Sequence, residues 1–382
     1  MSIKRLIAVF VTAAAASSIA AGHFPEASAA NVTAAQVAGQ TPVGTVKAWD
    51  APSSPPRVVN TGEPQEWVRQ VDHKNVLSYL VYSPSMNRDI PIAVLPATDA
   101  AGNRVAQAPI IYLLNGAGSA EQNQDWIRQA NVRDFFAGKG VNVVIPQAGA
   151  FSYYTDWVDS TVRSPYVNGP QKWETFLTKE LPGPIERTLN ADNRRAIVGF
   201  SMSGTSSLVL PTHQPGFYDA AASLSGCAAT SSPHGYTYAR LTVNRAGYGD
   251  FRTVTPERMW GPMGGPYNRW NDALVNAEKL RGTQLYISSA TGLAGRADQV
   301  SYLTGVGLPE LTAQLTAAQL QVEGGLIEAA INQCNHDLRA KLNGLNIPAH
   351  YDFREAGTHS WPYWREALGR AWQATLAPAL GL

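Results

Sequence analysis

The sequence predicts an α/β protein with a mainly parallel central sheet, helices on both faces of that sheet and a helical insert. Three observations lead to this fold class. Short apolar runs alternate along the chain with longer helix-like stretches. The later runs carry β-branched and aromatic residues at both odd and even positions, which is typical of strands buried on both faces. One of these runs ends at Ser201 in a turn rich in small residues and leads directly into a helical stretch.

The expected strands and helices follow in chain order from residue 66 onward. Strands are predicted at Val76–Tyr82, Ile90–Leu95, Pro109–Leu114, Val141–Pro146, Ala196–Phe200, Ala221–Leu224, Gln284–Ser288 and Ala349–Phe353. Helices are predicted at Trp173–Thr188, Ser203–Leu210, Asp272–Leu280 and Leu326–Leu342. The first strands are expected to be antiparallel and the later ones parallel. The stretch Val306–Gly325 looks like an added amphipathic helix that serves as a lid or surface insert.

The N-terminus has the pattern of a secretory signal peptide, which we place at residues 1–29. Lys4 and Arg5 precede an alanine-rich apolar stretch, and Ala27-Ser28-Ala29 offers small residues at the expected cleavage site. A membrane anchor is the alternative, but alanine and serine dilute the stretch and it is short for a span. We therefore expect a secreted, extracellular protein, with no transmembrane segment in the mature chain.

Two further segments follow the signal. Residues 30–65 are rich in Ala, Pro, Ser, Gly and Thr without a sustained period, which indicates a flexible leader or a surface arm. Residues 66–382 are expected to form a single catalytic domain, because 382 residues with 45% apolar side chains suffice for one large core.

Charge and cysteine content narrow the function classes. The net charge is +1 and no Lys/Arg block stands out, so neither nucleic acid nor an anionic membrane surface is expected as a partner. Cys227 and Cys334 are the only cysteines, and an exported protein could join them in a disulfide or bury them as two thiols. No Cys/His cluster has metal-ligand spacing, so we expect neither a metal nor another cofactor.

The strongest local signal is the segment Ala196–Gly204, an apolar strand that turns sharply at Ser201 into a helix. This strand–turn–helix context is the one a nucleophile elbow of the G-x-S-x-G type requires. Gly199 holds the first glycine position, whereas Ser203 replaces the second and Gly204 follows it. Ser203 is the alternative nucleophile. With Ser203 as the central serine, however, the first glycine position of the motif would be occupied by Ser201. Ser201 is therefore the predicted nucleophile.

A serine needs a base, an acid that orients the base, and donors for the oxyanion. His359 lies in a loop after the last predicted strand, where the base belongs in the chain order serine, acid, histidine. Asp298 is the only carboxylate in the loop after Gln284–Ser288 and is the predicted acid, with an ordinary loop aspartate as the alternative. The backbone N–H groups of Met202 and Ala117 are the predicted oxyanion donors.

Seven ordered motifs then identify a resemblance that covers roughly Leu77 to the C-terminus. They are Ser83-Pro-Ser-Met-Asn-Arg-Asp-Ile90, Tyr112-Leu-Leu-Asn-Gly116, Tyr154-Thr-Asp-Trp157, Lys172-Trp-Glu-Thr-Phe-Leu177, Gly199-Phe-Ser-Met202, Met259-Trp-Gly-Pro262 and Gly357-Thr-His-Ser-Trp361. With these motifs the sequence resembles the antigen 85-type mycolyltransferases of mycolic-acid-bearing bacteria. Seven matches in order are far more specific than the elbow alone.

The resemblance implies an α/β-hydrolase fold and a reaction. The family moves a mycolyl group from trehalose monomycolate to a second trehalose monomycolate or to cell-wall arabinogalactan through a seryl acyl-enzyme. Ser201 and His359 match its nucleophile and base, and Ala117 and Met202 match its oxyanion positions. Trp361 matches a tryptophan beside its sugar site.

The sequence also departs from the family pattern. The family's acid is a glutamate, and an ungapped alignment puts Arg296 in its place. Asp298 can act as the acid only if this loop is slightly longer than in the family. Asn115 stands where the family has an aspartate in the oxyanion loop, and it is expected with Trp361 to contact substrate. Gly118 replaces a sugar-binding arginine. The partners expected from the resemblance are trehalose mycolates and cell-wall glycan acceptors.

Two other functions are compatible with the same sequence. One is a secreted carboxylesterase that hydrolyses short or medium acyl esters. The other is a non-catalytic wall-binding relative, against which the retained Ser201 and His359 argue. The aromatic residues Trp157, Trp260 and Trp361 could form a sugar platform or belong to the core.

Overall fold

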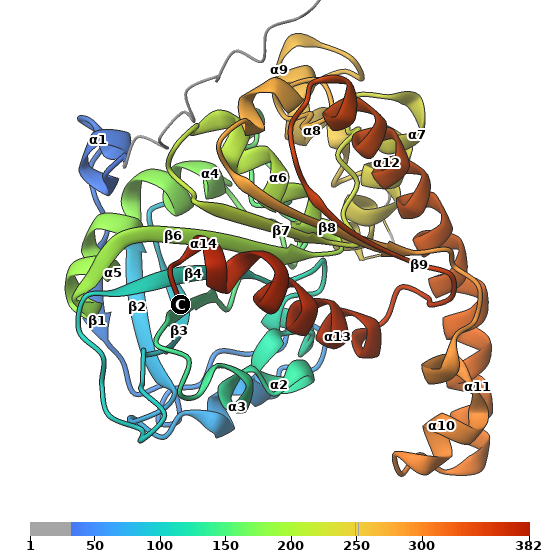
Figure 1. Ribbon diagram of the computed structural model, residues 1–382, viewed down its shortest axis with the longest axis horizontal. Coiled ribbons are helices and arrows are strands. Elements are labelled where there is room, and N and C mark those ends of the chain that lie inside the picture. The colour runs from blue at the N-terminus through green and yellow to red at the C-terminus, as the bar shows by residue number, and fades with distance from the viewer. Residues whose placement is uncertain (1–31, 249, 251) are drawn as a thin grey trace, which may run out of the picture.

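The protein is built on one nine-stranded sheet with the order β1-β2-β3-β5-β4-β6-β7-β8-β9 (Figure 1). The computed structural model describes residues 32–248, 250 and 252–382. The strands are β1 Thr45–Ala48, β2 Leu77–Ser83, β3 Arg88–Leu95, β4 Ala108–Leu114, β5 Asn142–Pro146, β6 Ala191–Phe200, β7 Ala220–Leu224, β8 Gln284–Ala290 and β9 His350–Arg354. Strands β1, β2 and β3 pair antiparallel, β3 is antiparallel to β5, and all pairs from β5 through β4 to β9 are parallel.

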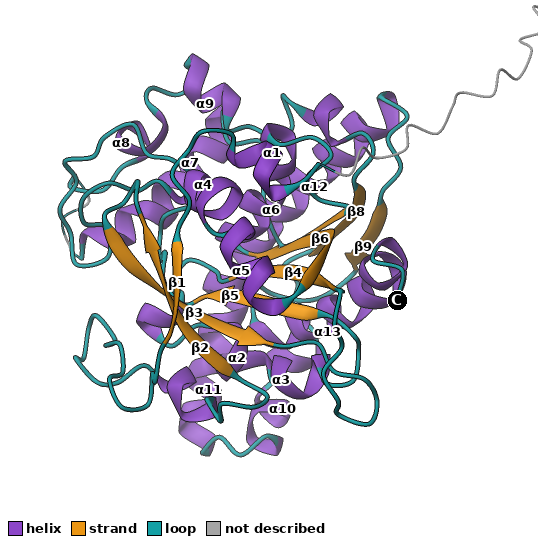
Figure 2. Cartoon of the chain, turned by 90° about the vertical axis from the view of Figure 1, so that its left-hand side faces the viewer, coloured by secondary structure: helices purple, strands orange, loops and turns teal. Residues whose placement is uncertain are grey.

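Helices cover both faces of this sheet (Figures 1 and 2). They are α1 Ala34–Ala38, α2 Trp126–Ala130, α3 Val132–Phe136, α4 Trp173–Thr175, α5 Pro182–Leu189, α6 Met202–His213, α7 Pro233–Val243, α8 Pro256–Trp260, α9 Pro266–Trp270, α10 Val300–Gly305, α11 Glu310–Gln319, α12 Gly325–Gly344, α13 Trp361–Ala371 and α14 Ala377–Ala379. π-helical turns join α4 to α5, α11 to α12 and α13 to α14.

The core has two halves because successive strand residues point to opposite faces. In β4, Ile110, Tyr112 and Leu114 pack on one face with side chains of α5, α6, α7 and α12. Ile111 and Leu113 pack on the other face with side chains of α2, α3 and α13. Every residue of β4 is buried, as expected for a central strand of a parallel sheet.

The predicted fold class is confirmed, including the antiparallel start and the parallel remainder of the sheet. All eight predicted strands are present, and each end lies within five residues of its predicted position. The interval Asp272–Leu280 forms only a short 3-10 turn at Ala277–Leu280, so the helix predicted there is wrong. The turn-forming Asn271-Asp272 pair is buried, and Asp272 accepts backbone hydrogen bonds from Ser231 and Val275 instead of continuing a helix.

The segment predicted as a flexible leader is part of the fold where it is described. Residues 45–48 form β1, which pairs with β2 at the edge of the sheet, and Ala34 of α1 is buried in the core. The flexible-leader alternative is therefore corrected for residues 32–65, because some of them pair in the sheet or pack in the core, whereas their many exposed side chains agree with the surface-arm alternative. The predicted signal peptide at 1–29 lies outside the described residues. In the described part of the chain, no helix is both long and apolar enough to cross a membrane.

The predicted insert forms α11 and the π-helical turn Leu320–Gly324, which runs without a break into α12. A small separate core of Leu303, Ala313 and Ala317 holds α10 against α11. In Figure 1 these two helices project beyond the body of the protein at the lower right. The insert thus extends the helix that leads back toward β9.

Candidate active site

Ser201 lies at the carboxyl end of β6 and directly before α6. Its backbone has φ 55° and ψ −124°, a conformation that side-chain-bearing residues rarely adopt and that turns the strand sharply into the helix. The turn leaves no room at Gly199, where an added Cβ would lie 2.1 Å from the Ser203 carbonyl oxygen. Gly204 is constrained as well, though less severely, because its Cβ would lie 2.9 Å from the Cα of Gly226. The second glycine of the motif lies at position 204 instead of 203, and there it allows the start of α6 to lie close to the backbone of Gly226.

Ser203 has a structural role in this turn. It is fully buried, its Oγ accepts a hydrogen bond from the Phe200 N–H at 3.0 Å, and it donates to the Leu114 carbonyl at 3.0 Å. These contacts tie the elbow to the end of β4. Ser201 therefore borders open cavities at the end of β6, whereas Ser203 borders neither of them.

His359 contacts Ser201 across the top of the sheet. Its Nε2 lies 2.7 Å from Ser201 Oγ, although 158 positions separate the two residues. Its Nδ1 lies 2.7 Å from Oε2 of Glu328. Since an ionised carboxylate only accepts hydrogen bonds, Nδ1 carries the proton and Nε2 is left to accept the serine proton. This is the arrangement in which a serine can be activated.

Glu328 lies on α12 and is held by donors from outside that helix, directly after β7 and at the end of β8. It is buried, and its Oε1 accepts hydrogen bonds from Ser225 Oγ and from the Ala290 N–H, both at 2.8 Å. Trp364 donates its indole N–H to Ser225 at 3.1 Å and packs edge-on against the His359 ring. The carboxylate is therefore fixed in position and keeps only one oxygen for the imidazole.

The structure corrects the predicted acid, because Asp298 does not contact His359. Its buried carboxylate accepts hydrogen bonds from Thr358 Oγ1 at 2.7 Å, from the Tyr363 hydroxyl at 2.6 Å and from the Gly295 N–H at 2.8 Å. Asp298 thus holds the loop that carries the histidine. Sequence reasoning missed Glu328 because the insert separates it from β8 by almost forty positions. The sequence did contain a signal for Glu328. It precedes Ile331, Leu338 and Leu342 by three, ten and fourteen positions, and this spacing places its carboxylate on the apolar, buried face of the predicted helix.

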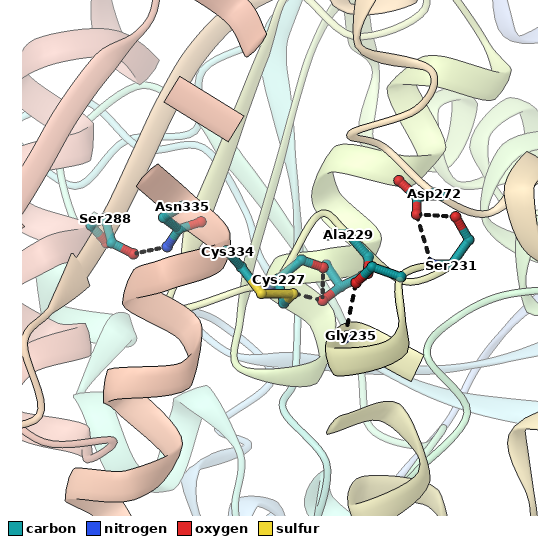
Figure 3. Close-up of a disulfide and its surroundings, with 10 residues drawn as sticks. Cys227, Ala229, Ser231, Gly235, Asp272, Ser288, Cys334 and Asn335 are labelled. Carbon is teal, nitrogen blue, oxygen red and sulfur yellow. Dashed lines mark hydrogen bonds between the residues drawn. A yellow bond between two sulfur atoms is a disulfide. The ribbon is translucent and has the colours of Figure 1, made fainter. Parts of the chain in front are cut away.

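A disulfide joins Cys227 to Cys334 across 107 positions (Figure 3). Cys334 lies on α12 six residues after Glu328, and Cys227 exchanges hydrogen bonds with Thr205 of α6 at 3.0 and 3.1 Å. Beside it, Asn335 donates to the Ser288 carbonyl at 3.3 Å. Of the two alternatives for the cysteines, the structure contains the disulfide. It fastens the helix of Glu328 to the loop after β7, which is in turn hydrogen-bonded to α6.

Two cavities meet at Ser201 and His359. The first has a volume of about 500 Å³ and is lined mainly by apolar side chains of α7 and α12, among them Leu241, Leu326 and Ile331. The second, of about 400 Å³, has a more polar lining that includes Gln122, Gln124 and Glu323. Arg245 borders both cavities. One side of the serine is thus suited to a hydrocarbon chain and the other to a hydroxyl-rich group.

The predicted oxyanion residues border this site. Ala117 lines both cavities and Met202 lines the first, next to Ser201. Met202 is the first residue of α6, so its N–H has no partner within the helix. Both residues therefore line a cavity that also contains Ser201.

Of the two predicted substrate contacts, Trp361 is partly exposed in a cavity and Asn115 is buried. Trp361 lines the second cavity, where it packs on Phe200 at 4.5 Å and donates to Gln124 at 3.0 Å. Asn115 does not reach either cavity, which corrects its expected contact with substrate. It is fully buried, donates to the Pro146 carbonyl at 2.9 Å and accepts from the Trp126 N–H at 3.1 Å. Trp157 and Trp260 are also buried, so of the three tryptophans only Trp361 could serve a sugar platform.

No group of three or more His, Cys, Asp or Glu side chains within the described ranges is arranged to hold a metal ion.

Comparison with solved structures supports the fold. MPT51 (FbpC1) of Mycobacterium tuberculosis superimposes with a TM-score of 0.58 and 23% identity, over 78% of this chain and 95% of that one. FphF, a fluorophosphonate-binding serine hydrolase of Staphylococcus aureus, gives a TM-score of 0.53 and 14% identity, over 80% and 98%. The fold is that of the α/β hydrolases.

Sequence comparison defines the family more narrowly. Residues 83–375 match the Esterase family. The diacylglycerol acyltransferase/mycolyltransferase Ag85A of Mycobacterium tuberculosis is 30% identical over 305 residues, which cover 79% of this chain and 80% of the relative. Ag85B of Mycolicibacterium smegmatis is 29% identical over 296 residues, covering 76% and 81%. The chain belongs to the Esterase family and to the family of the Ag85 acyltransferases/mycolyltransferases.

Proposed function

We propose that the protein is an exported mycolyltransferase that moves an acyl chain from trehalose monomycolate to another sugar hydroxyl through an acyl-enzyme on Ser201. The observation that carries the proposal is the hydrogen-bonded series Ser201–His359–Glu328 at the junction of an apolar and a polar cavity. The relatives named as mycolyltransferases support the choice of acyl donor.

The first half-reaction transfers the acyl group to the enzyme. Ser201 Oγ attacks the ester carbonyl of the donor while His359 Nε2 takes the hydroxyl proton. The N–H groups of Ala117 and Met202 stabilise the negative oxygen of the tetrahedral intermediate. As the intermediate collapses, the carbon–oxygen bond to trehalose breaks, and His359 returns the proton to the departing trehalose oxygen.

The second half-reaction runs the same steps in reverse with a new alcohol. The acyl chain stays in the apolar cavity while the acceptor sugar enters the polar one beside Trp361. His359 takes the proton of an acceptor hydroxyl, which attacks the acyl carbonyl and frees Ser201. Transfer competes with hydrolysis, so the site must position the sugar and limit water.

Export is supported by two features. The N-terminal 29 residues have a signal-peptide pattern, and a disulfide such as Cys227–Cys334 persists in oxidising compartments. The acceptor, either trehalose monomycolate or cell-wall arabinogalactan, would then be met in the cell envelope.

The test is an assay with purified protein, trehalose monomycolate and product identification by mass spectrometry. We expect trehalose dimycolate and free trehalose, and loss of both with Ser201→Ala. If the protein released only free mycolic acid, it would be an esterase. If it released nothing and did not react with a fluorophosphonate probe, it would be a binding protein on this fold.

A further inference from the structure

Exposed apolar side chains are concentrated in one part of the described chain. Six of its large exposed hydrophobic residues fall between positions 293 and 326. They are Leu293, Val306, Leu311, Leu315, Val322 and Leu326, and the last four are between 66% and 72% exposed. A cluster of this kind on a soluble domain indicates a binding surface, because scattered single residues would be expected otherwise.

Four of these residues share one side of a single helix. The helix runs from Glu310 through α11 and the π-helical turn into α12. At about 100° per residue in the α-helical parts and about 82° in the five-residue π-helical turn, Leu311, Leu315, Val322 and Leu326 fall in a sector about 75° wide. The stripe is about 22 Å long, since fifteen residues separate its ends.

This stripe does not help to hold the helix in place. Ala313 and Ala317 lie on roughly the opposite side of α11 and form the small core with Leu303. The stripe residues belong to none of the buried clusters of the described chain. Figure 1 shows α10 and α11 projecting away from the sheet, so the stripe is presented outside the body of the protein.

The stripe continues into the apolar cavity that holds Ser201. Leu326, at its end, lines that cavity together with Leu241 of α7, which is 65% exposed. The turn between α11 and α12 also borders the second cavity through Leu320 and Glu323. An apolar path therefore leads from the tip of the insert to the nucleophile.

Charge along the insert favours one kind of partner. Between residues 299 and 327 only Glu310 and Glu323 are charged, and there is no lysine or arginine. Such a surface has no means of attracting anionic headgroups. It can gain free energy only by removing its apolar side chains from water.

We propose that the stripe Leu311–Leu315–Val322–Leu326 docks on a lipid layer, with these side chains inserted among acyl chains. The proposal rests on the proposed function for the identity of the cargo, a lipid-borne acyl ester. With the stripe seated in the layer, the acyl chain passes along it into the cavity at Ser201 without crossing water. The projection and length of the insert allow contact with the layer while the body of the protein stays outside it.

Flotation with phosphatidylcholine vesicles tests the docking directly. The double variant Leu311→Ser/Leu315→Ser removes two stripe residues that line neither cavity and are exposed, so the fold should be retained. Val158→Ser/Met263→Ser is the matched control, because these residues are 54% and 51% exposed and also lie outside both cavities. We expect about a tenfold or greater loss of vesicle binding for the stripe variant and none for the control.

Changes of lipid composition distinguish apolar docking from electrostatic binding, and a comparison of two substrates distinguishes a loss of docking from a loss of catalysis. Binding should not increase with phosphatidylglycerol or fall with salt, and an electrostatic dependence would overturn the proposal. Hydrolysis of a soluble short-chain nitrophenyl ester should be equal in all variants, whereas turnover of a vesicle-embedded long-chain ester should fall for the stripe variant. Equal flotation of stripe variant and parent, or dimerisation through the stripe in light scattering, would contradict docking. Failure of the soluble-ester reaction in the parent would instead count against the proposed function.

Discussion

Replacing Glu328 by glutamine tests the role of the carboxylate that the structure places beside His359. The substitution keeps the side-chain shape and removes the negative charge. In the parent, Oε1 accepts hydrogen bonds from Ser225 and from the Ala290 N–H, so the oxygen of a glutamine amide would take this position. The NH₂ group would then face His359 Nδ1.

An NH₂ group at Nδ1 selects the wrong imidazole tautomer. Nδ1 would have to accept, which moves the proton to Nε2, where it points at Ser201 and cannot take the serine proton. The comparable Asp→Asn change in a serine protease lowers kcat about 10⁴-fold with the geometry intact. We therefore expect a loss of about 10³- to 10⁴-fold in kcat/KM, which corresponds to roughly 4–5.5 kcal/mol of transition-state stabilisation.

The assay is steady-state hydrolysis of a soluble nitrophenyl ester by Glu328→Gln, with Asp298→Asn as the paired variant. Asp298 reaches His359 only through Thr358, so its variant should lose about tenfold or less. Melting temperatures of both variants should be measured, so that a loss of fold is recognised. The reasoning is refuted if the loss is larger in Asp298→Asn than in a folded Glu328→Gln.

Three further changes test other parts of the structure. A Cys227→Ser/Cys334→Ser variant should lose about 2–5 kcal/mol of unfolding free energy in urea titrations, because the bond closes a loop of about a hundred residues; an unchanged midpoint would contradict this. Gly199→Ala should abolish activity and lower the melting temperature, since its Cβ would lie 2.1 Å from the Ser203 carbonyl oxygen, and an active, stable variant would exclude the elbow geometry. Burial raises the pKa of Glu121 from 4.5 to about 7, so the protonated form is favoured on folding and the parent should lose stability as the pH rises from 5 to 8. Over this pH range the unfolding free energy of Glu121→Gln should fall by up to about 3 kcal/mol less than that of the parent. An equal change of melting temperature with pH in the two proteins would disprove this.

The central sheet and the Ser201 elbow could be predicted because their signals are local. Apolar runs of four to seven residues mark the buried strands, and the steric demands at Gly199 fix the turn within a few positions. His359 could be predicted as well, although distant, because chain order places a base after the last strand. What these residues share is that neighbouring sequence or the fold order determines their position.

Glu328 and β1 could not be predicted because their positions depend on distant contacts. Glu328 reaches His359 only after the insert has carried the chain through α10 and α11 and back, and Asp298 stood closer to the expected place. β1 has only four residues, three of them exposed, in a segment rich in Ala and Pro. Its pairing with β2 supplies the hydrogen bonds that composition alone does not reveal.

The most direct test of the central claim is rapid-quench mass spectrometry of the protein mixed with trehalose monomycolate. The account predicts a mycolyl adduct on the peptide that contains Ser201, which decays faster when trehalose is added, with trehalose monomycolate re-formed on the added sugar. An adduct on another residue, or product formation by Ser201→Ala without any adduct, would contradict it.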